Sequence, residues 1–248
     1  MKGGSALKGK LKRLAAVALL LIGVGLIFLQ PARELWDGGG AKREAAAAVK
    51  QYHHGGKKRP VGAVLSMPSV GLELPIYKSR ADLNYGVYTE LVDEKPSTAP
   101  GDNNYVLAGH SSYVPTVWLS PMFKLTTANG YVRNASAPYR PSDYQGGTGK
   151  PGNIIIYTKQ ATYTYRADKA YTVRGNDDSI LSDPAVGSAK QIRVFTCPRH
   201  INHPPFRYVV QGSLTKVQPT AAGRRAGVDT TLTTKTQTTY HSGALSSN

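Results

Sequence analysis

Three side chains in this sequence could together carry out acyl transfer. Cys197, His110 and Arg207 each lie at the end of a run of apolar residues. A thiolate can attack a carbonyl carbon, an imidazolium can protonate the leaving amine, and a guanidinium can hold the substrate or the developing oxyanion. The sequence therefore contains a complete set of groups for cysteine-based acyl transfer.

Cys197 is the only cysteine of the chain, so it cannot form an intrachain disulfide. It is either a small core side chain or a nucleophile. Its place at a strand end favours the nucleophile, and so does the predicted export of the chain, because a lone thiol is a liability outside the cell. If the strand before Cys197 pairs antiparallel with the strand that Arg207 opens, the two residues face each other at one sheet edge.

Short runs of β-branched and aromatic residues, separated by Gly, Pro, Asn and Asp, predict the elements that position these groups. The expected strands are Gly62–Met67, Leu72–Tyr77, Tyr105–Ala108, Ile154–Tyr157, Ala161–Arg166, Lys169–Arg174, Gln191–Thr196 and Tyr208–Leu214. A hairpin is expected to turn near Lys159 and Gln160. These runs predict one all-β domain over 61–217, an antiparallel barrel or sandwich with a few short helices.

The N-terminus predicts a membrane anchor. Residues 1–13 hold five basic and no acidic residues, and an uninterrupted apolar run of 16 residues, Leu14–Leu29, follows them. As a helix the run would span about 24 Å, a little less than the hydrocarbon core. We favour an uncleaved transmembrane anchor over 14–32 rather than a cleaved signal peptide. The basic residues predict a single-pass protein of the cell membrane, with residues 1–13 in the cytoplasm and the β domain outside.

Two further segments differ in composition from the β domain. Residues 33–60 are rich in glycine and alanine and predict a flexible stalk between anchor and domain. Residues 218–248 are rich in Ser and Thr and poor in large apolar side chains, which predicts a disordered tail.

The formal net charge of +16 does not indicate a nucleic-acid partner. More than half of the positive excess lies outside 61–218, and no basic cluster alternates with aromatic residues. Four other histidines are expected in a loop, His200 and His203, and in the stalk, His53 and His54.

No cofactor is expected. Asp177, Asp178 and Asp183 could contribute to a Ca²⁺ site, but a solvated turn is favoured, because Ca²⁺ needs six or more oxygen ligands arranged together.

An ordered set of short motifs resembles the sortase family. The matching segments, spread over about 61–215, are Met67–Tyr77, Leu107–His110, Phe123–Leu125 and Val194–Cys197, together with Arg207. The resemblance implies an eight-stranded sortase barrel whose catalytic residues are Cys197, His110 and Arg207. It further implies substrate contacts by Thr196, Ala108 and Gly109.

The resemblance also implies a function. Sortases are membrane-anchored cysteine transpeptidases that cleave a Leu-Pro-x-Thr-Gly type sorting signal of exported proteins after Thr. They hold the product as a thioester, which here would form on Cys197, and transfer it to an amine of peptidoglycan or of a pilin. The sequence shows neither the lid motif nor the second membrane helix of pilin-polymerising class C members, so a housekeeping class A or class D/E type is expected.

The sequence departs from the family pattern in two places. Arg193 stands where the strand before the cysteine usually begins with Thr, and residues 133–150 form an insertion of unassigned role.

Two alternative functions remain open: another cysteine hydrolase, or a catalytically silent, membrane-tethered barrel that binds surface proteins. A crosslinker of the L,D-transpeptidase type is disfavoured because Thr196, not glycine, precedes the cysteine. A silent barrel has no reason to keep Cys197, His110 and Arg207 together.

Overall fold

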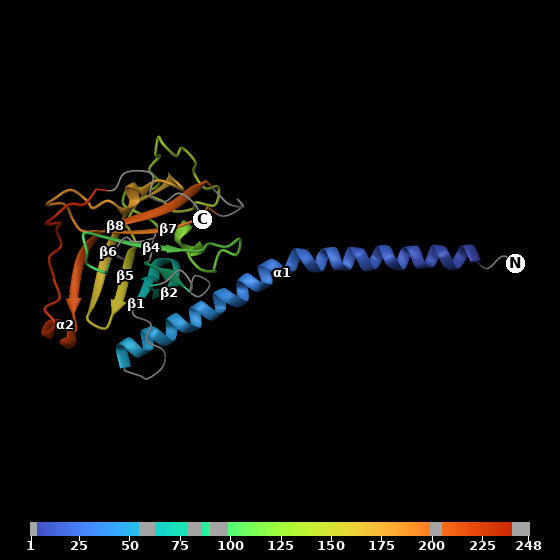
Figure 1. Cartoon of the computed structure of the whole chain (residues 1–248), viewed down its shortest axis with the longest axis horizontal. Helices are drawn as coiled ribbons and strands as arrows, with labels where there is room; N and C mark the ends of the chain where they lie inside the picture. Colours follow the sequence, from blue (N-terminus) through green and yellow to red (C-terminus); the bar gives the residue numbers. More distant parts are fainter. Residues whose placement is uncertain (1–3, 55–62, 79–85, 90–98, 199–204, 240–248) are drawn as a thin grey trace.

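The protein folds into a closed β-barrel with one long helix at its N-terminus (Figure 1). The computed structural model describes residues 4–54, 63–78, 86–89, 99–198 and 205–239. Around the barrel the strand order is β1-β2-β3-β4-β7-β8-β6-β5. The predicted all-β fold is confirmed, and of the two architectures that the strand pattern allowed, the structure shows the barrel.

The barrel has eight strands: β1 (Ala63–Met67), β2 (Leu72–Tyr77), β3 (Val87–Tyr88), β4 (Asn104–Gly109), β5 (Asn153–Thr158), β6 (Ala161–Arg174), β7 (Gln191–Thr196) and β8 (Phe206–Pro219). The short helices are η1 (Pro68–Val70), η3 (Ser120–Lys124), η4 (Asp178–Leu181) and α2 (Ala221–Arg225). Two neighbouring pairs, β2 with β3 and β4 with β7, run parallel, and the other pairs are antiparallel.

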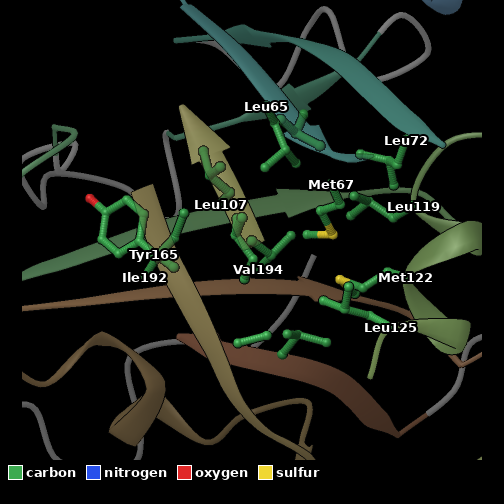
Figure 2. Close-up of a cluster of buried hydrophobic side chains, with 14 of the residues drawn as sticks. Leu65, Met67, Leu72, Leu107, Leu119, Met122, Leu125, Tyr165, Ile192 and Val194 are labelled. Carbon is green, nitrogen blue, oxygen red and sulfur yellow. The ribbon is translucent and has the colours of Figure 1, made fainter. Parts of the chain in front are cut away.

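The two faces of the barrel wall carry two apolar clusters. The larger cluster fills the interior, where Leu107 of β4 and Val194 of β7 meet Met67 of β1 (Figure 2). A smaller cluster contains Val106 of β4 and Val209 of β8 and is completed by residues of η4. Because successive side chains of a strand point to opposite faces, this second cluster marks the outer face of the same strands.

Helix α1 (Gly4–His54) is continuous through the predicted anchor and into the predicted stalk. Within the described residues it is the one helix long and apolar enough to cross a membrane, over Leu14–Ala47. Pro31 lies inside it, and Figure 1 shows the helix changing direction along its length. A proline within a helix removes one backbone hydrogen bond and bends the axis.

The structure thus differs from the flexible stalk predicted over 33–60. Residues 33–54 are helical, and residues 55–60 lie outside the described residues. Glycine weakens a helix by about 1 kcal/mol relative to alanine. Here contacts with the barrel offset that cost, because Ala41 and Ala45 of α1 are fully buried.

The segment after β8 also differs from its prediction as a disordered tail. Residues 220–239 include α2 and then run along the connection between η4 and β7, where Lys190 N donates to Leu232 O and Thr234 N donates to Ser188 O, at 2.8 Å each. The composition predicted disorder because the segment has few apolar side chains to bury. Backbone hydrogen bonds to another segment do not depend on apolar side chains, so they can hold it in place. Residues 240–248 lie outside the described residues.

Candidate active site

Strand register brings the three predicted catalytic residues to one end of the barrel wall. The last pair of β4 and β7 is Gly109 with Thr196, and the last pair of β7 and β8 is Thr196 with Tyr208. His110, Cys197 and Arg207 are therefore the next residues along β4, β7 and β8 at this end of the sheet. Neighbouring strands lie about 4.8 Å apart, so the three residues are close together. All three side chains are partly buried.

The alternation of side chains places the three residues on the same face. Val106, Phe195 and Val209 contribute to the outer cluster. Val106 is four positions from His110, Phe195 is two positions from Cys197, and Val209 is two positions from Arg207, so each pair shares a face. The thiol, the imidazole and the guanidinium thus come from neighbouring strands and from the outer face of the wall. This is the arrangement that the antiparallel pairing of β7 and β8 was expected to give.

The backbone around His110 is closely packed. A Cβ atom on Gly109 would lie 2.9 Å from side-chain atoms of both Leu119 and Val87, so glycine suits this position. Leu119 N donates to His110 O at 3.0 Å, and the Trp118 ring lies 5.4 Å from the imidazole ring at a tilt of 51°. Trp118 has a φ of 49°, in the left-handed region, which costs a residue other than glycine about 1–3 kcal/mol. Strain of this size persists only where the surroundings fix the backbone, so the loop that places Trp118 beside His110 is held firmly.

Two hydroxyl groups fix the backbone around Cys197. Thr196 is fully buried, and its Oγ1 donates to Gly109 O at 2.8 Å, which ties the ends of β4 and β7 together. Ser111 Oγ donates to Cys197 O at 2.6 Å. Ser111 was not among the predicted site residues, and its place directly after His110 was the available signal.

The residues expected to contact substrate, Thr196, Ala108 and Gly109, lie at this same strand end. Ala108 is 1% exposed and pairs with Phe195, while Gly109 pairs with Thr196. Substrate contact by these residues stays a prediction. The role visible in the structure is to join the two strands that carry the histidine and the cysteine.

Arg207 opens β8 beside the end of β6. Its Nη1 donates to Phe206 O at 3.0 Å, and a Cβ atom on Gly175 would lie 3.5 Å from the guanidinium carbon. Gly175 N donates to Pro205 O at 2.7 Å, which closes the backbone around the arginine. A methyl group at position 175 would thus be in van der Waals contact with the guanidinium.

The insertion 133–150 packs beside this end of the barrel. Tyr144 belongs to the interior cluster, and the Tyr139 ring stacks on Phe206 with 5.4 Å between ring centroids. Arg174 at the end of β6 donates to Ser136 O at 2.9 Å. The insertion therefore borders the strand start that carries Arg207.

Arg193, where the sequence departs from the family pattern, holds η4 against β7. Its Nη1 donates to the carbonyls of Ser179, Ile180 and Ser182 at 3.0, 2.7 and 2.9 Å. Burial lowers the pKa of the guanidinium from its usual value, an effect opposed by nearby Tyr171 and by the carboxylates of Asp183 and Asp177. The arginine thereby fixes the segment that covers the outer cluster next to the site.

Two of the three aspartates considered for Ca²⁺ accept hydrogen bonds from backbone amides, and the third is buried. Asp177 accepts from Ser179 N at 3.0 Å, Asp183 accepts from Thr238 N at 3.0 Å, and Asp178 is fully buried. Within the part of the chain that the structure describes, no three His, Cys, Asp or Glu side chains gather as a metal site would require. His200 and His203 lie outside the described residues, and His53 and His54 end α1.

A family model, the sortase domain, matches residues 65–215, which is more than half of the chain. The chain belongs to the sortase family. The match covers every strand from β2 to β7, most of β1 and β8, and all three candidate catalytic residues. Sortases are cysteine transpeptidases, so the protein is an enzyme of that general kind.

The solved structures that match the chain include three sortases. Sortase A of Listeria monocytogenes has a TM-score of 0.49 and 19% identity over 68% of this chain and 97% of that chain. Sortase E1 of Streptomyces coelicolor, solved with a tripeptide in its active site, has a TM-score of 0.46 and 20% identity over 70% and 97%. Sortase C-1 of Actinomyces oris has a TM-score of 0.44 and 20% identity over 68% and 81%. No curated protein sequence matches the chain.

Proposed function

We propose that the protein is a membrane-anchored transpeptidase that joins exported proteins to a surface amine through a thioester on Cys197. The observation that supports this most directly is the register of β4, β7 and β8, which brings His110, Cys197 and Arg207 together on one face. The substrate class is a Leu-Pro-x-Thr-Gly type sorting signal, and the acceptor is an amine of peptidoglycan or of a pilin.

The reaction uses the three groups in two half-reactions. The Cys197 thiolate attacks the carbonyl carbon of the Thr–Gly bond, and the His110 imidazolium gives its proton to the departing glycine amine, which leaves the thioester. An acceptor amine then attacks the thioester, His110 takes the amine proton, and the thiolate is released. Arg207 supplies fixed positive charge for the substrate or for the oxyanion of each tetrahedral intermediate.

The test is mass spectrometry on the full chain in detergent micelles with a Leu-Pro-x-Thr-Gly peptide library and a small amine. We expect an acyl adduct on Cys197 and a peptide–amine product, and we expect Cys197→Ala to yield neither. His110→Ala and Arg207→Ala should each lower kcat/KM by at least about a hundredfold. A folded wild-type protein that binds the peptides without forming adduct or product would favour the silent barrel. Hydrolysis without transfer would favour another cysteine hydrolase.

We further propose that α1 anchors the protein with its N-terminus in the cytoplasm and the barrel outside. The exposed apolar side chains of α1, such as Leu19 at 69% and Ile27 at 70%, support the anchor, and the basic residues before them support its orientation. In intact cells a membrane-impermeant maleimide should label Cys197, the only thiol. Labelling that requires lysis would place the barrel inside.

Class and metal dependence complete the proposal. A housekeeping type predicts transfer of one sorting-signal protein to one amine, so a pilin-like substrate bearing both a signal and an internal lysine should give no ladder of covalent multimers.

We also propose that the reaction needs no metal ion. Activity should then be unchanged in excess EGTA, and a loss restored by Ca²⁺ would contradict this.

A further inference from the structure

One face of the second half of α1 lies against the barrel. The residues of this docking face, spaced three or four apart, are Glu34, Gly38, Ala41 and Ala45. This spacing is that of a single helix face. Leu35 and Trp36, between them in sequence, are 51% and 77% exposed. The helix therefore contacts the barrel along one line and is not wrapped by it.

The docking face meets the barrel at two places. Farther along the helix, Ala41 joins the interior cluster, and Glu44, beside Ala45, accepts a hydrogen bond from Tyr77 of β2. Nearer the membrane segment, the helix contacts the residues that follow His110. We refer to residues 110–119 as the His110 loop.

The contact between α1 and the His110 loop combines close packing with a hydrogen bond. A Cβ atom on Gly38 would lie 2.4 Å from Cγ1 of Val117, so only glycine permits this approach of helix and loop. One turn earlier in the helix, the Glu34 carboxylate accepts a hydrogen bond from Ser112 Oγ. Ser112 Oγ also accepts from Val114 N at 2.9 Å, so the same hydroxyl links the helix to the turn of the loop.

The other side of the His110 loop faces the candidate active site. Ser111, next to Ser112, donates to Cys197 O, and Trp118, next to Val117, lies against the His110 ring. The loop closes on itself through a bridge between Ser111 and Trp118. The loop is thus held between α1 on one side and the cysteine and histidine on the other.

We propose that the membrane helix positions the active site: the docking face of α1 holds the His110 loop so that His110 and Cys197 keep their productive geometry. The proposal rests on the proposed function and assigns Glu34 and Gly38 as positioning residues, because they act through the loop. Displacement of a reacting group by about 1 Å can lower a rate about a hundredfold, so a modest shift of the loop has a large effect.

The test compares two glycine substitutions in the full chain, purified in detergent micelles and assayed for peptide–amine transfer. Gly38→Leu inserts a side chain between helix and loop, whereas Gly40→Leu, two residues on, enters open space, since no atom lies within 4 Å of its Cβ position. Both variants change helix propensity equally. We expect kcat to fall at least about tenfold in Gly38→Leu, with KM for the peptide within about twofold, and Gly40→Leu to match wild type.

A rescue experiment separates positioning from general damage. Gly38→Ala alone places its Cβ 2.4 Å from Cγ1 and 3.0 Å from Cγ2 of Val117. Val117→Ala removes both methyl groups and leaves only its Cβ at 3.1 Å, a contact that a small shift relieves. We expect Gly38→Ala to lower kcat, Val117→Ala alone to leave it within about twofold, and the double variant to recover it, a non-additivity typical of residues in contact.

The outcomes distinguish this proposal from the proposed function. A wild-type protein that yields no transfer product overturns the proposed function and the positioning role together. Transfer by wild type with equal kcat in Gly38→Leu and Gly40→Leu, and with both barrels folded by circular dichroism, overturns the positioning role alone. A double variant no more active than Gly38→Ala would also contradict it.

Discussion

The hydroxyl of Thr196 joins the two strands that carry His110 and Cys197. It donates to Gly109 O from a fully buried position. Thr196→Val keeps the shape of the side chain but removes that donor, so we expect the free energy of unfolding to fall by about 1 kcal/mol. Because the strand ends are no longer tied, kcat should fall about tenfold.

Thr215→Val provides the matched control for that experiment. Thr215 Oγ1 also donates to a backbone carbonyl, that of Thr164, at 3.0 Å, but the residue is exposed and far along β8. Urea denaturation and steady-state kinetics measure both quantities. A Thr196→Val variant with the kcat of Thr215→Val would show that the hydroxyl has no part in placing the catalytic groups.

Arg193 offers a second prediction for a single side chain. Arg193→Lys keeps the positive charge but loses the planar fork that reaches three carbonyls of the η4 segment. A hydrogen bond from a charged group contributes about 1.5–3 kcal/mol to stability. We therefore expect Arg193→Lys to lower the free energy of unfolding by about 2 kcal/mol. Arg166→Lys, at an exposed ion pair with Asp168, should cost less than about 1 kcal/mol. Equal losses in the two variants would contradict this role of Arg193.

Among the elements, the segment after β8 holds the connection that leads into β7. We refer to its residues 229–234, which contact residues 188–190, as the strap. Asp229 pairs with the buried Lys190 at 2.9 Å, and hydrogen bonds from Thr231 and Lys190 lower the pKa of its carboxyl well below the usual range. A lowered folded-state pKa means that the contribution to stability is present above the unfolded pKa of about 3.9 and is lost as the pH falls below it. The strap should therefore loosen in acid.

Asp229→Asn tests the strap by hydrogen exchange of the Lys190 and Thr234 amides, which donate across it. Corrected for intrinsic rates, exchange should be faster in the variant than in wild type at pH 6–7. The difference should shrink progressively as the pH falls below about 4, where Asp229 of the detached segment begins to bind a proton that the folded carboxylate does not yet bind. A constant difference across this range would show that the charge of Asp229 is irrelevant.

Sequence patterns identified most strands but not how they join. The predicted strands Ala161–Arg166 and Lys169–Arg174 form one strand, β6, with a register shift between Ala167 and Lys169. Asp168 breaks the apolar pattern there, because aspartate is unfavourable in a regular strand, yet a bulge accommodates it. Strand β3 was not predicted, since two residues carry no periodicity and form a strand only by pairing with β2 and β4.

The candidate site could be predicted to the level of its strand ends. Cys197 and Arg207 follow from local pattern and from the antiparallel pairing of consecutive strands. The pairing of β4 with β7 joins segments far apart in the chain, so the place of His110 beside them came only from the family resemblance. The contact of Glu34 with Ser112 depends on where a helix docks, although the spacing of Glu34, Gly38, Ala41 and Ala45 was a visible signal.

On the scale of the whole molecule, the docking face begins close to the end of the apolar run. Glu34 follows Leu29 by five residues, or about 7.5 Å of helix, so the proposed anchor would hold the His110 loop near the lipid headgroups. Trp36, on the exposed face of α1, should lie in that layer, where tryptophan is favoured.

Fluorescence quenching in proteoliposomes measures this depth. The chain has two tryptophans, Trp36 and Trp118, so Trp118→Phe leaves Trp36 as the sole reporter. We expect a nitroxide at the lipid headgroup to quench Trp36 more strongly than a nitroxide deep in the acyl chains. Quenching by neither probe would show that this part of α1 stands clear of the bilayer.

The position of β7 between β4 and β8 also bears on the order in which the proposed catalytic residues are assembled. A nascent chain that has emerged only as far as β6 already carries His110 but neither Cys197 nor Arg207. Even after Cys197 has emerged, β7 is an edge strand until β8 follows and pairs with it. Chains that stop before β8 therefore lack both Arg207 and the strand that pairs with β7, so the proposed activity requires β8 to be in place.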